Sequence, residues 1–311
     1  MTLLAQVNPP PLWFSVVLVA AIWGFLGVWG SVLIRRSRGL PILPFQRRRP
    51  VPWRGVDVLL VLAAGIALLT VFHGLVVWIL GPELTRLPAI SDPENSNAAH
   101  VITRLIAEGN LRVFVLCAFS AALVAPIVEE FLFRLLLQGW LEALQRRLRR
   151  SMPLLGRVMP GGFVPILLTS VVFARMHFRV ETPMAHPYYY LGLMLGTSVA
   201  GLLTMYFAIK FLPLRVGATA NDLGWSAKHF FADVRLGLVA FAGLAAPIYA
   251  VQFALLRVLP EYVAPDPFVL FFFAIALGVL YHRTHRIVPS IVLHMSLNTM
   301  SLVIALLALQ K

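Results

Sequence analysis

Two adjacent glutamates, Glu129 and Glu130, lie inside a long apolar run, whereas the other acidic residues fall in predicted loops or near predicted helix ends. If that run crosses a membrane, each carboxylate costs a few kcal/mol, so intramembrane acids usually face a polar interior and mark a functional site. Arg134 follows Glu130 at the spacing of four that favours a helical ion pair. Glu129 lies about 100° further around the helix, where we expect no such cation. One paired and one unpaired carboxylate suit separate acid and base roles; an interhelical ion-pair cluster is the alternative.

Two further motifs place polar side chains one helical turn apart. Phe173 and His177 are separated by four residues, so they share one helix face. A single histidine of this kind is either a catalyst or a hydrogen-bonded packing residue. His294 and Asn298 have the same spacing in an apolar run that begins after Pro289. Two hydrogen-bonding groups on one face could bind an oxyanion or a substrate, or they could join helices as polar contacts.

Composition places these residues in a lipid bilayer. Hydrophobic residues make up 59% of the 311 residues and charged residues only 13%, and the mean hydropathy is +0.84. A water-soluble domain has a much larger polar fraction. A bilayer core about 30 Å thick requires roughly 20 apolar residues per helix, and several segments reach that length without an acidic residue. We therefore predict an all-α, polytopic transmembrane helix bundle.

Hydropathy, together with the positions of proline and glycine, predicts about eight membrane spans. The first span ends in arginines rather than at a small-residue cleavage site, which indicates a retained anchor. The predicted helices are residues 12–34, 57–80, 111–140, 163–180, 188–212, 236–259, 268–282 and 289–309.

The formal net charge of +13 reflects arginines that gather in short loops, so it does not indicate a nucleic-acid-binding face. The loop 35–56 contains seven arginines, whereas residues 81–110 contain four acidic residues and two arginines. The positive-inside rule then places loops 35–56 and 141–162 and the turn before the last span in the cytoplasm, with both termini outside. Arg175 and Arg179 do not fit this scheme, because they end a span on the opposite side.

We expect the remaining histidines and the single cysteine to have structural rather than chemical roles. Cys117 lies in an apolar run, cannot form an internal disulfide and is predicted to be a packing residue. Six histidines have no second polar residue at helical spacing within a span, so we expect them at interfaces or in loops. They are His73, His100, His186, His229, His282 and His285.

Taken together, E-E-x-x-x-R, F-x-x-x-H and H-x-x-x-N, in this order on three apolar helices, resemble the motifs of the CPBP family. This family contains the type II CAAX prenyl endopeptidases and the bacterial Abi proteins. The resemblance covers residues 111–180 and 266–309. Residues 181–265 separate the second motif from the third, which are usually closer together in the family.

The resemblance implies an intramembrane glutamic endopeptidase, and we predict that it uses no cofactor and no metal. Glu129 would be the general base that activates water, and His177 would help to position that water. His294 and Asn298 would stabilise the oxyanion. The implied partners are a membrane-associated peptide or protein substrate and the lipid bilayer, without nucleic acid, and the implied location is a bacterial-type plasma membrane. The implied supporting residues are Glu130 and Arg134.

The same resemblance divides the chain into two parts. Residues 1–110 are predicted to form N-terminal membrane helices and loops. Residues 111–311 are predicted to form the protease-like core, with an inserted helical segment at 181–265.

Two alternatives to the metal-free enzyme remain. Glu129, His177 and His294 could bind zinc with water as the fourth ligand, although the chain has no H-E-x-x-H motif. A non-enzymatic scaffold or small-solute transporter could also keep polar residues at membrane depth. An enzyme requires these side chains to meet at one site, whereas a scaffold would leave them in separate helix contacts.

Overall fold

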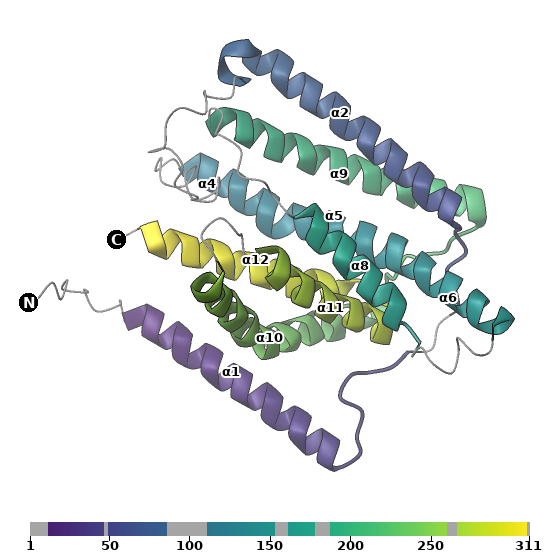
Figure 1. The fold of residues 1–311 in the computed structure, drawn as a ribbon, viewed down its shortest axis with the longest axis vertical. Helices are drawn as coiled ribbons and strands as arrows, with labels where there is room; N and C mark the ends of the chain where they lie inside the picture. The colour runs from purple at the N-terminus through teal and green to yellow at the C-terminus, as the bar shows by residue number, and fades with distance from the viewer. Residues whose placement is uncertain are drawn as a thin grey trace, which may run out of the picture.

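In a computed structural model, the described residues form a bundle of long apolar helices, which confirms the predicted all-α polytopic architecture (Figure 1). The structure describes residues 12–46, 49–85, 111–152, 161–177, 187–259 and 266–309. Within this part of the chain, seven helices are long and apolar enough to cross a membrane. Apolar side chains cover much of the outer surface, among them Trp78 at 79% exposure, as a helix bundle in lipid requires.

The helices agree closely with the predicted segments. The first two are α1 (Leu12–Ser37) and α2 (Gly55–Thr85). One continuous helical run then contains α4 (Leu111–Ala118), η2 (Phe119–Val124), α5 (Ala125–Glu130), η3 (Phe131–Gln138) and α6 (Gly139–Ser151). The remaining elements are α8 (Phe163–Met176), α9 (Pro187–Val216), the short 3₁₀ helix η4 (Ala227–His229), α10 (Phe230–Val258), α11 (Asp266–Thr284) and α12 (Val288–Leu309).

The helix observed in the predicted span 163–180 is shorter than predicted. The structure describes this span only as far as residue 177. Helix α8 has 14 residues, which corresponds to about 21 Å and is less than a bilayer core. It begins after Gly162, whose φ of +82° is left-handed, and ends at His177. Residues 178–180 lie outside the described residues. Helix α8 begins near the arginine-rich end of the bundle, and its described length is shorter than the thickness of a bilayer core.

The run from Leu111 to Ser151 is not a uniform α-helix. Its segments η2 and η3 are π-helical, and the short α5, which contains both glutamates, lies between them. Short π-helical segments interrupt α-helices rarely, and frequently at functional sites. The predicted helix over 111–140 is present, but it contains these π-helical segments and continues to Ser151, into the region predicted to be the loop 141–162.

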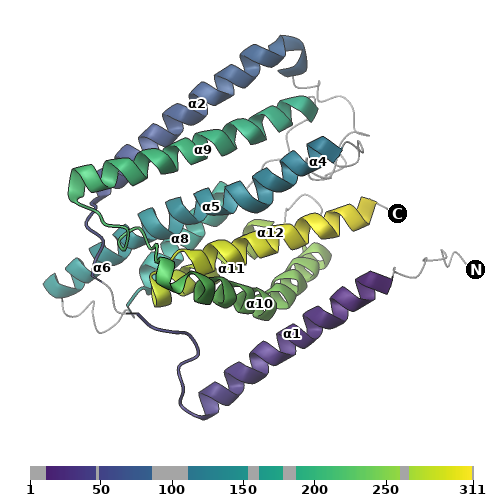
Figure 2. The same ribbon diagram turned by 180° about the vertical axis from the view of Figure 1, so that it is seen from behind.

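Helices α2 and α9 lie side by side along one edge of the bundle and α1 lies along the opposite edge (Figures 1 and 2). Between them, α12 packs against α10 and α8 packs against α11. At the first turn of α10, the buried Asp233 forms an ion pair with Arg286. The Oδ1 atom of Asp233 lies 2.9 Å from Nε of Arg286. This contact joins α10 to the turn that precedes α12.

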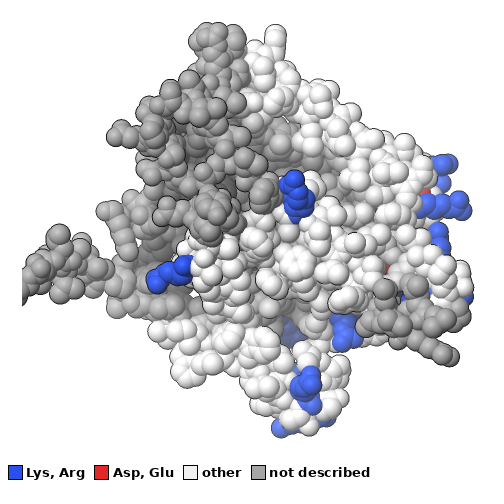
Figure 3. Space-filling view, in the orientation of Figure 1, with Lys and Arg blue, Asp and Glu red and all other residues white. Residues whose placement is uncertain are grey.

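Positive charge gathers at one end of the bundle. Helices α1 and α6 end there and α2 begins there, whereas both termini lie at the other end. On the face shown in Figure 3, most Lys and Arg atoms lie toward the edge where α6 ends. This distribution agrees with the predicted orientation, which stays a prediction. The acidic loop used for that prediction lies mostly outside the described residues, as do Arg179, His100 and His186.

The close approach of α10 and α12 generates a stability prediction. A Cβ added at Gly237 would lie 2.7 Å from Val292 Cβ and 2.8 Å from the carbonyl oxygen of Pro289, whereas one added at Gly74 would meet nothing within 4 Å. We expect Gly237→Ala to destabilise the protein by about 1–3 kcal/mol, because the backbone of α10 or α12 would have to move to make room for the methyl group. Gly74→Ala, the matched control, should be neutral or slightly stabilising. Thermal unfolding in detergent measures both, and equal midpoints would contradict this packing.

Candidate active site

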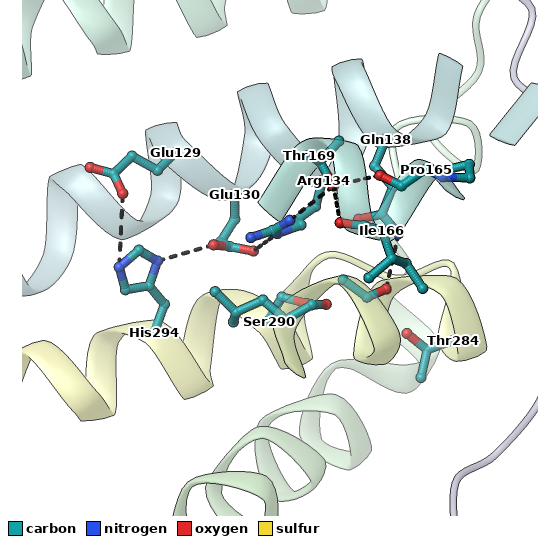
Figure 4. Close-up of polar contacts among 12 residues, drawn as sticks. Glu129, Glu130, Arg134, Gln138, Pro165, Ile166, Thr169, Thr284, Ser290 and His294 are labelled. Atoms are coloured by element: carbon teal, nitrogen blue, oxygen red, sulfur yellow. Dashed lines mark hydrogen bonds and ion pairs between the residues drawn. The ribbon is translucent and has the colours of Figure 1, made fainter. Parts of the chain in front are cut away.

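Three of the four residues predicted to be catalytic converge on one carboxylate oxygen. Oε2 of Glu129 lies 3.7 Å from Nε2 of His177 and 3.8 Å from Nε2 of His294. The three side chains come from α5, from the C-terminal end of α8 and from α12. Figure 4 shows His294 between the two glutamates. Residues separated by up to 165 positions in the sequence therefore form one polar site.

In both histidines, the ring nitrogen that faces away from Glu129, Nδ1, makes a hydrogen bond that orients the imidazole. Nδ1 of His177 lies 2.7 Å from the carbonyl oxygen of Phe173, and Nδ1 of His294 lies 3.0 Å from Oε1 of Glu130. A carbonyl oxygen can only accept, and the Glu130 carboxylate faces a guanidinium, so in both cases Nδ1 is the donor. In the neutral ring the lone pair is then on Nε2, the atom that faces Glu129.

Aromatic rings fix the two histidines from their other sides. The Phe173 ring lies 4.4 Å from the His177 ring and 5.9 Å from the His294 ring, centroid to centroid. Phe273 contacts His294 edge to face at 5.2 Å. The F-x-x-x-H spacing therefore brings an aromatic side chain between the two histidines.

The predicted ion pair of Glu130 and Arg134 is confirmed. Arg134 Nε lies 3.4 Å from Glu130 Oε2, and both side chains are fully buried. Arg134 Nη1 also donates to Thr169 Oγ1 at 3.4 Å, and its guanidinium lies over the Phe173 ring at 5.4 Å. Glu130 thus connects the cation to His294, as Figure 4 shows.

Asn298 is placed differently from the other three. Its Nδ2 donates to the carbonyl oxygen of Ala121 at 2.8 Å. The Ala125 N–H bonds to the Ser120 carbonyl in the π-helical pattern, so the next donor would come from Pro126, which has no N–H. Asn298 supplies the missing donor and holds α12 against η2. Its predicted role at an oxyanion stays a prediction.

Exposure differs sharply across the cluster. The side chains of Glu129 and His177 are 25% and 29% exposed, whereas those of Glu130 and His294 are 0% and 4% exposed. Oε2 of Glu129 is itself buried. The cluster is therefore open on the side of Glu129 and His177, while Glu130 and His294 are enclosed.

A second polar cluster was missed by the sequence analysis. Glu142 is buried and accepts hydrogen bonds from Gln138 and His282, and His285 Nδ1 lies 3.8 Å from it. We had expected this acid to lie near water and both histidines to be interface or loop residues. The repeated spacing of four from Glu130 through Arg146 was the available signal. Asp57 and Asp233, which were also expected near water, are buried and ion-paired.

Within the described residues, no group of three or more His, Cys, Asp or Glu side chains is arranged to hold a metal ion. Cys117 is buried, as its interpretation as a packing residue predicts.

Comparison with known families identifies the chain. The family model described as type II CAAX prenyl endopeptidase Rce1-like matches residues 111–217 and 225–300, more than half of the chain. The protein belongs to this family. It is an integral, multi-pass membrane protein and a CAAX-type peptidase of the intramembrane endopeptidase class. No curated protein and no solved structure gives a match.

Membership in the Rce1-like family implies a membrane-associated peptide substrate that the enzyme meets in the bilayer. The match includes all of the residues of the three motifs. It also includes most of 181–265, so the division into an N-terminal part, a core and an insertion remains a proposal.

The buried ion pair generates a second stability prediction. Arg134→Met should destabilise the protein by about 3–5 kcal/mol, because it leaves Glu130 as an unpaired charge at membrane depth. The double variant Glu130→Gln/Arg134→Met should recover part of that loss, since no charge is then left unpaired. Thermal unfolding in detergent measures both variants. An unchanged midpoint with lost peptidase activity would instead place Arg134 in the reaction itself.

Proposed function

We propose that this Rce1-like protein is a glutamic intramembrane endopeptidase in which Glu129 is the general base that activates water. The observation that carries the proposal is the convergence of His177 Nε2 and His294 Nε2 on Glu129 Oε2 at 3.7 and 3.8 Å. A scaffold would have no need to bring three polar side chains from three helices to one point, two of them partly exposed. The geometry therefore favours an enzyme over a scaffold or a transporter.

The orientation of His177 supports water as the group that occupies this point. With Nδ1 of His177 donating to the Phe173 carbonyl oxygen, two acceptors face one another: Nε2 of His177 and Oε2 of Glu129. A water molecule can donate two hydrogen bonds to such a set. Its oxygen lone pair then points away from the acceptors and toward a substrate. This is the arrangement that general-base catalysis requires.

In the proposed reaction, Glu129 takes a proton from water as the water oxygen forms a bond to the peptide carbonyl carbon. The carbonyl oxygen becomes an oxyanion in a tetrahedral intermediate. The carbon–nitrogen bond then breaks, and the proton held by Glu129 passes to the leaving nitrogen. His177 holds the water in line with Glu129. No net proton or electron is left over, and Glu129 returns to its ionised state.

We further propose His294 and Asn298 as the groups that stabilise the oxyanion. Because Nδ1 of His294 donates to Glu130, this role requires a second proton on Nε2. The resulting imidazolium would lie between two carboxylates, a favourable charge arrangement. Asn298 would use its second amide N–H, since the first bonds to Ala121. Such donors are typically worth a hundredfold or more in turnover.

The substrate and location follow the same reasoning. The exposed side of the cluster belongs to helices surrounded by apolar surface, so we propose a peptide segment that enters from the membrane. By resemblance to the bacterial Abi proteins, we propose a bacterial-type plasma membrane as the location.

A zinc-dependent version of the same site is the second candidate. Two imidazole Nε2 atoms and a carboxylate oxygen are suitable zinc ligands, and the hydrogen bonds from both Nδ1 atoms resemble those of ligating histidines. We propose the metal-free mechanism because the chain has no H-E-x-x-H motif, and the response to a chelator separates the two mechanisms.

Replacing the general base tests the mechanism directly. Glu129→Gln should abolish cleavage and leave the protein folded, because a nearly isosteric side chain loses only its ability to take a proton. Cleavage of a fluorogenic membrane peptide by purified protein measures this. Asp222→Asn makes the same chemical change in the exposed turn at Thr219 and should retain full activity. Glu129→Gln activity within a few-fold of wild type would exclude Glu129 as the base.

The two candidate mechanisms respond oppositely to metal removal. In the metal-free mechanism a strong chelator leaves turnover unchanged, while Asn298→Ala lowers it by roughly a hundredfold with little change in substrate binding. In the zinc mechanism the active protein contains about one equivalent of metal, and its removal and return switch activity off and on. Elemental analysis with a chelator titration distinguishes them, and reversible loss with stoichiometric zinc would overturn our proposal.

A further inference from the structure

A second site lies at the arginine-rich end of the bundle, about 20 Å along the same helix from Glu129 at the α-helical rise. At its base, Glu142 accepts hydrogen bonds from Gln138 Nε2 and His282 Nδ1, both at 3.1 Å. Arg146 Nη2 lies 3.6 Å from the same carboxylate. The proposed peptide hydrolysis uses none of these residues.

A cavity of about 470 Å³ opens above this cluster, and its lining is strongly basic. Four arginines from two separate segments line it: Arg49 from the loop between α1 and α2, and Arg146, Arg149 and Arg150 from the end of α6. The one carboxylate in the lining is Glu142, and it is already engaged by Gln138 and His282. The cavity therefore has an excess of positive charge, and guanidinium groups bind phosphate with particularly good geometry.

The start of α8 forms one wall of the cavity and adds to its positive potential. Gly161 and Gly162 line the cavity, and Gly162 is the N-cap of α8, so the positive end of a 14-residue helix borders it. A Cβ added at Gly162 would collide with the His282 ring. The Gly162 N–H also donates to Gln145 Oε1 at 2.9 Å. Only glycine allows α8 to begin this close to the histidine and leave the cavity open.

We propose that this cavity binds the phosphate headgroup of an anionic phospholipid from the leaflet on the arginine-rich side. Phosphate is the shared chemistry of lipid headgroups and free inorganic phosphate. Two observations favour the lipid: the cavity lies where the membrane helices α6, α8 and α11 end or begin, and Phe45, which is 60% exposed, borders it. Basic pockets between transmembrane helices on the cytoplasmic side characteristically hold such headgroups. A bound lipid would hold together α6, α8 and α11.

Lipid binding to the purified full-length protein tests the proposal without reference to peptidase activity, so its outcome is independent of the proposed mechanism. Native mass spectrometry after delipidation would compare phosphatidylglycerol with phosphatidylcholine. We expect wild type to retain phosphatidylglycerol preferentially. Arg149→Gln/Arg150→Gln should weaken that binding at least about tenfold, because two charged hydrogen-bond donors are lost. The matched control, Arg36→Gln/Arg38→Gln at the exposed end of α1, should change it less than about twofold.

Two further measurements make the result decisive. Arg149→Lys/Arg150→Lys keeps the charge and should retain more phosphatidylglycerol binding than the Gln variant, which separates lost charge from lost folding. Inorganic phosphate, added in place of lipid, should not compete at equal concentration. If phosphatidylglycerol binds the Gln variant as tightly as wild type, the site is refuted. If inorganic phosphate competes equally and phosphatidylcholine binds as well as phosphatidylglycerol, the lipid assignment is refuted.

Discussion

The arrangement of the side chains around the proposed active site depends on one buried ion pair, Glu130 with Arg134. A charge at membrane depth is strongly destabilising unless it is paired, and both of these side chains are fully buried. The pairing leaves the second oxygen of Glu130 to accept a hydrogen bond from His294. That bond turns the other ring nitrogen of His294 toward Glu129. The neighbouring glutamates therefore have different surroundings, since Glu130 is paired with a guanidinium and Glu129 faces two histidines.

The irregular geometry of the central helix keeps its polar residues in line. In an α-helix a step of four residues overshoots a full turn by about 40°, so polar residues at that spacing would gradually rotate into the lipid. A π-helical segment is wider and needs more than four residues per turn, so the same step falls short and the drift is corrected. Here η3 lies within the series Glu130, Arg134, Gln138, Glu142 and Arg146, of which the first four are buried.

This series connects two polar sites at different depths. The inner one contains the proposed base and is open on the side of Glu129 and His177. The outer one, around Glu142, lies at the basic end, where α6, α8 and α11 meet. The two sites share the continuous run from Leu111 to Ser151 and helix α8 without sharing residues, because His177 at the C-cap of α8 lies in the inner site and Gly162 at its N-cap lies in the outer one. Helix α8 has 14 residues, about 21 Å, and this length separates its N-cap in the outer site from its C-cap in the inner one.

The sequence by itself determined the membrane bundle, the positions of nearly all its helices and the Glu130–Arg134 pair, because hydrophobic length and a spacing of four are local properties. It also indicated Glu129, His177, His294 and Asn298 as candidates. Only the tertiary structure decided which of them meet, because those contacts join helices far apart in the chain. It brought Glu129 to two histidines, but it directed Asn298 to a carbonyl left without a donor by Pro126. It also brought His282 to Glu142 across 140 residues, a contact that no local spacing contains.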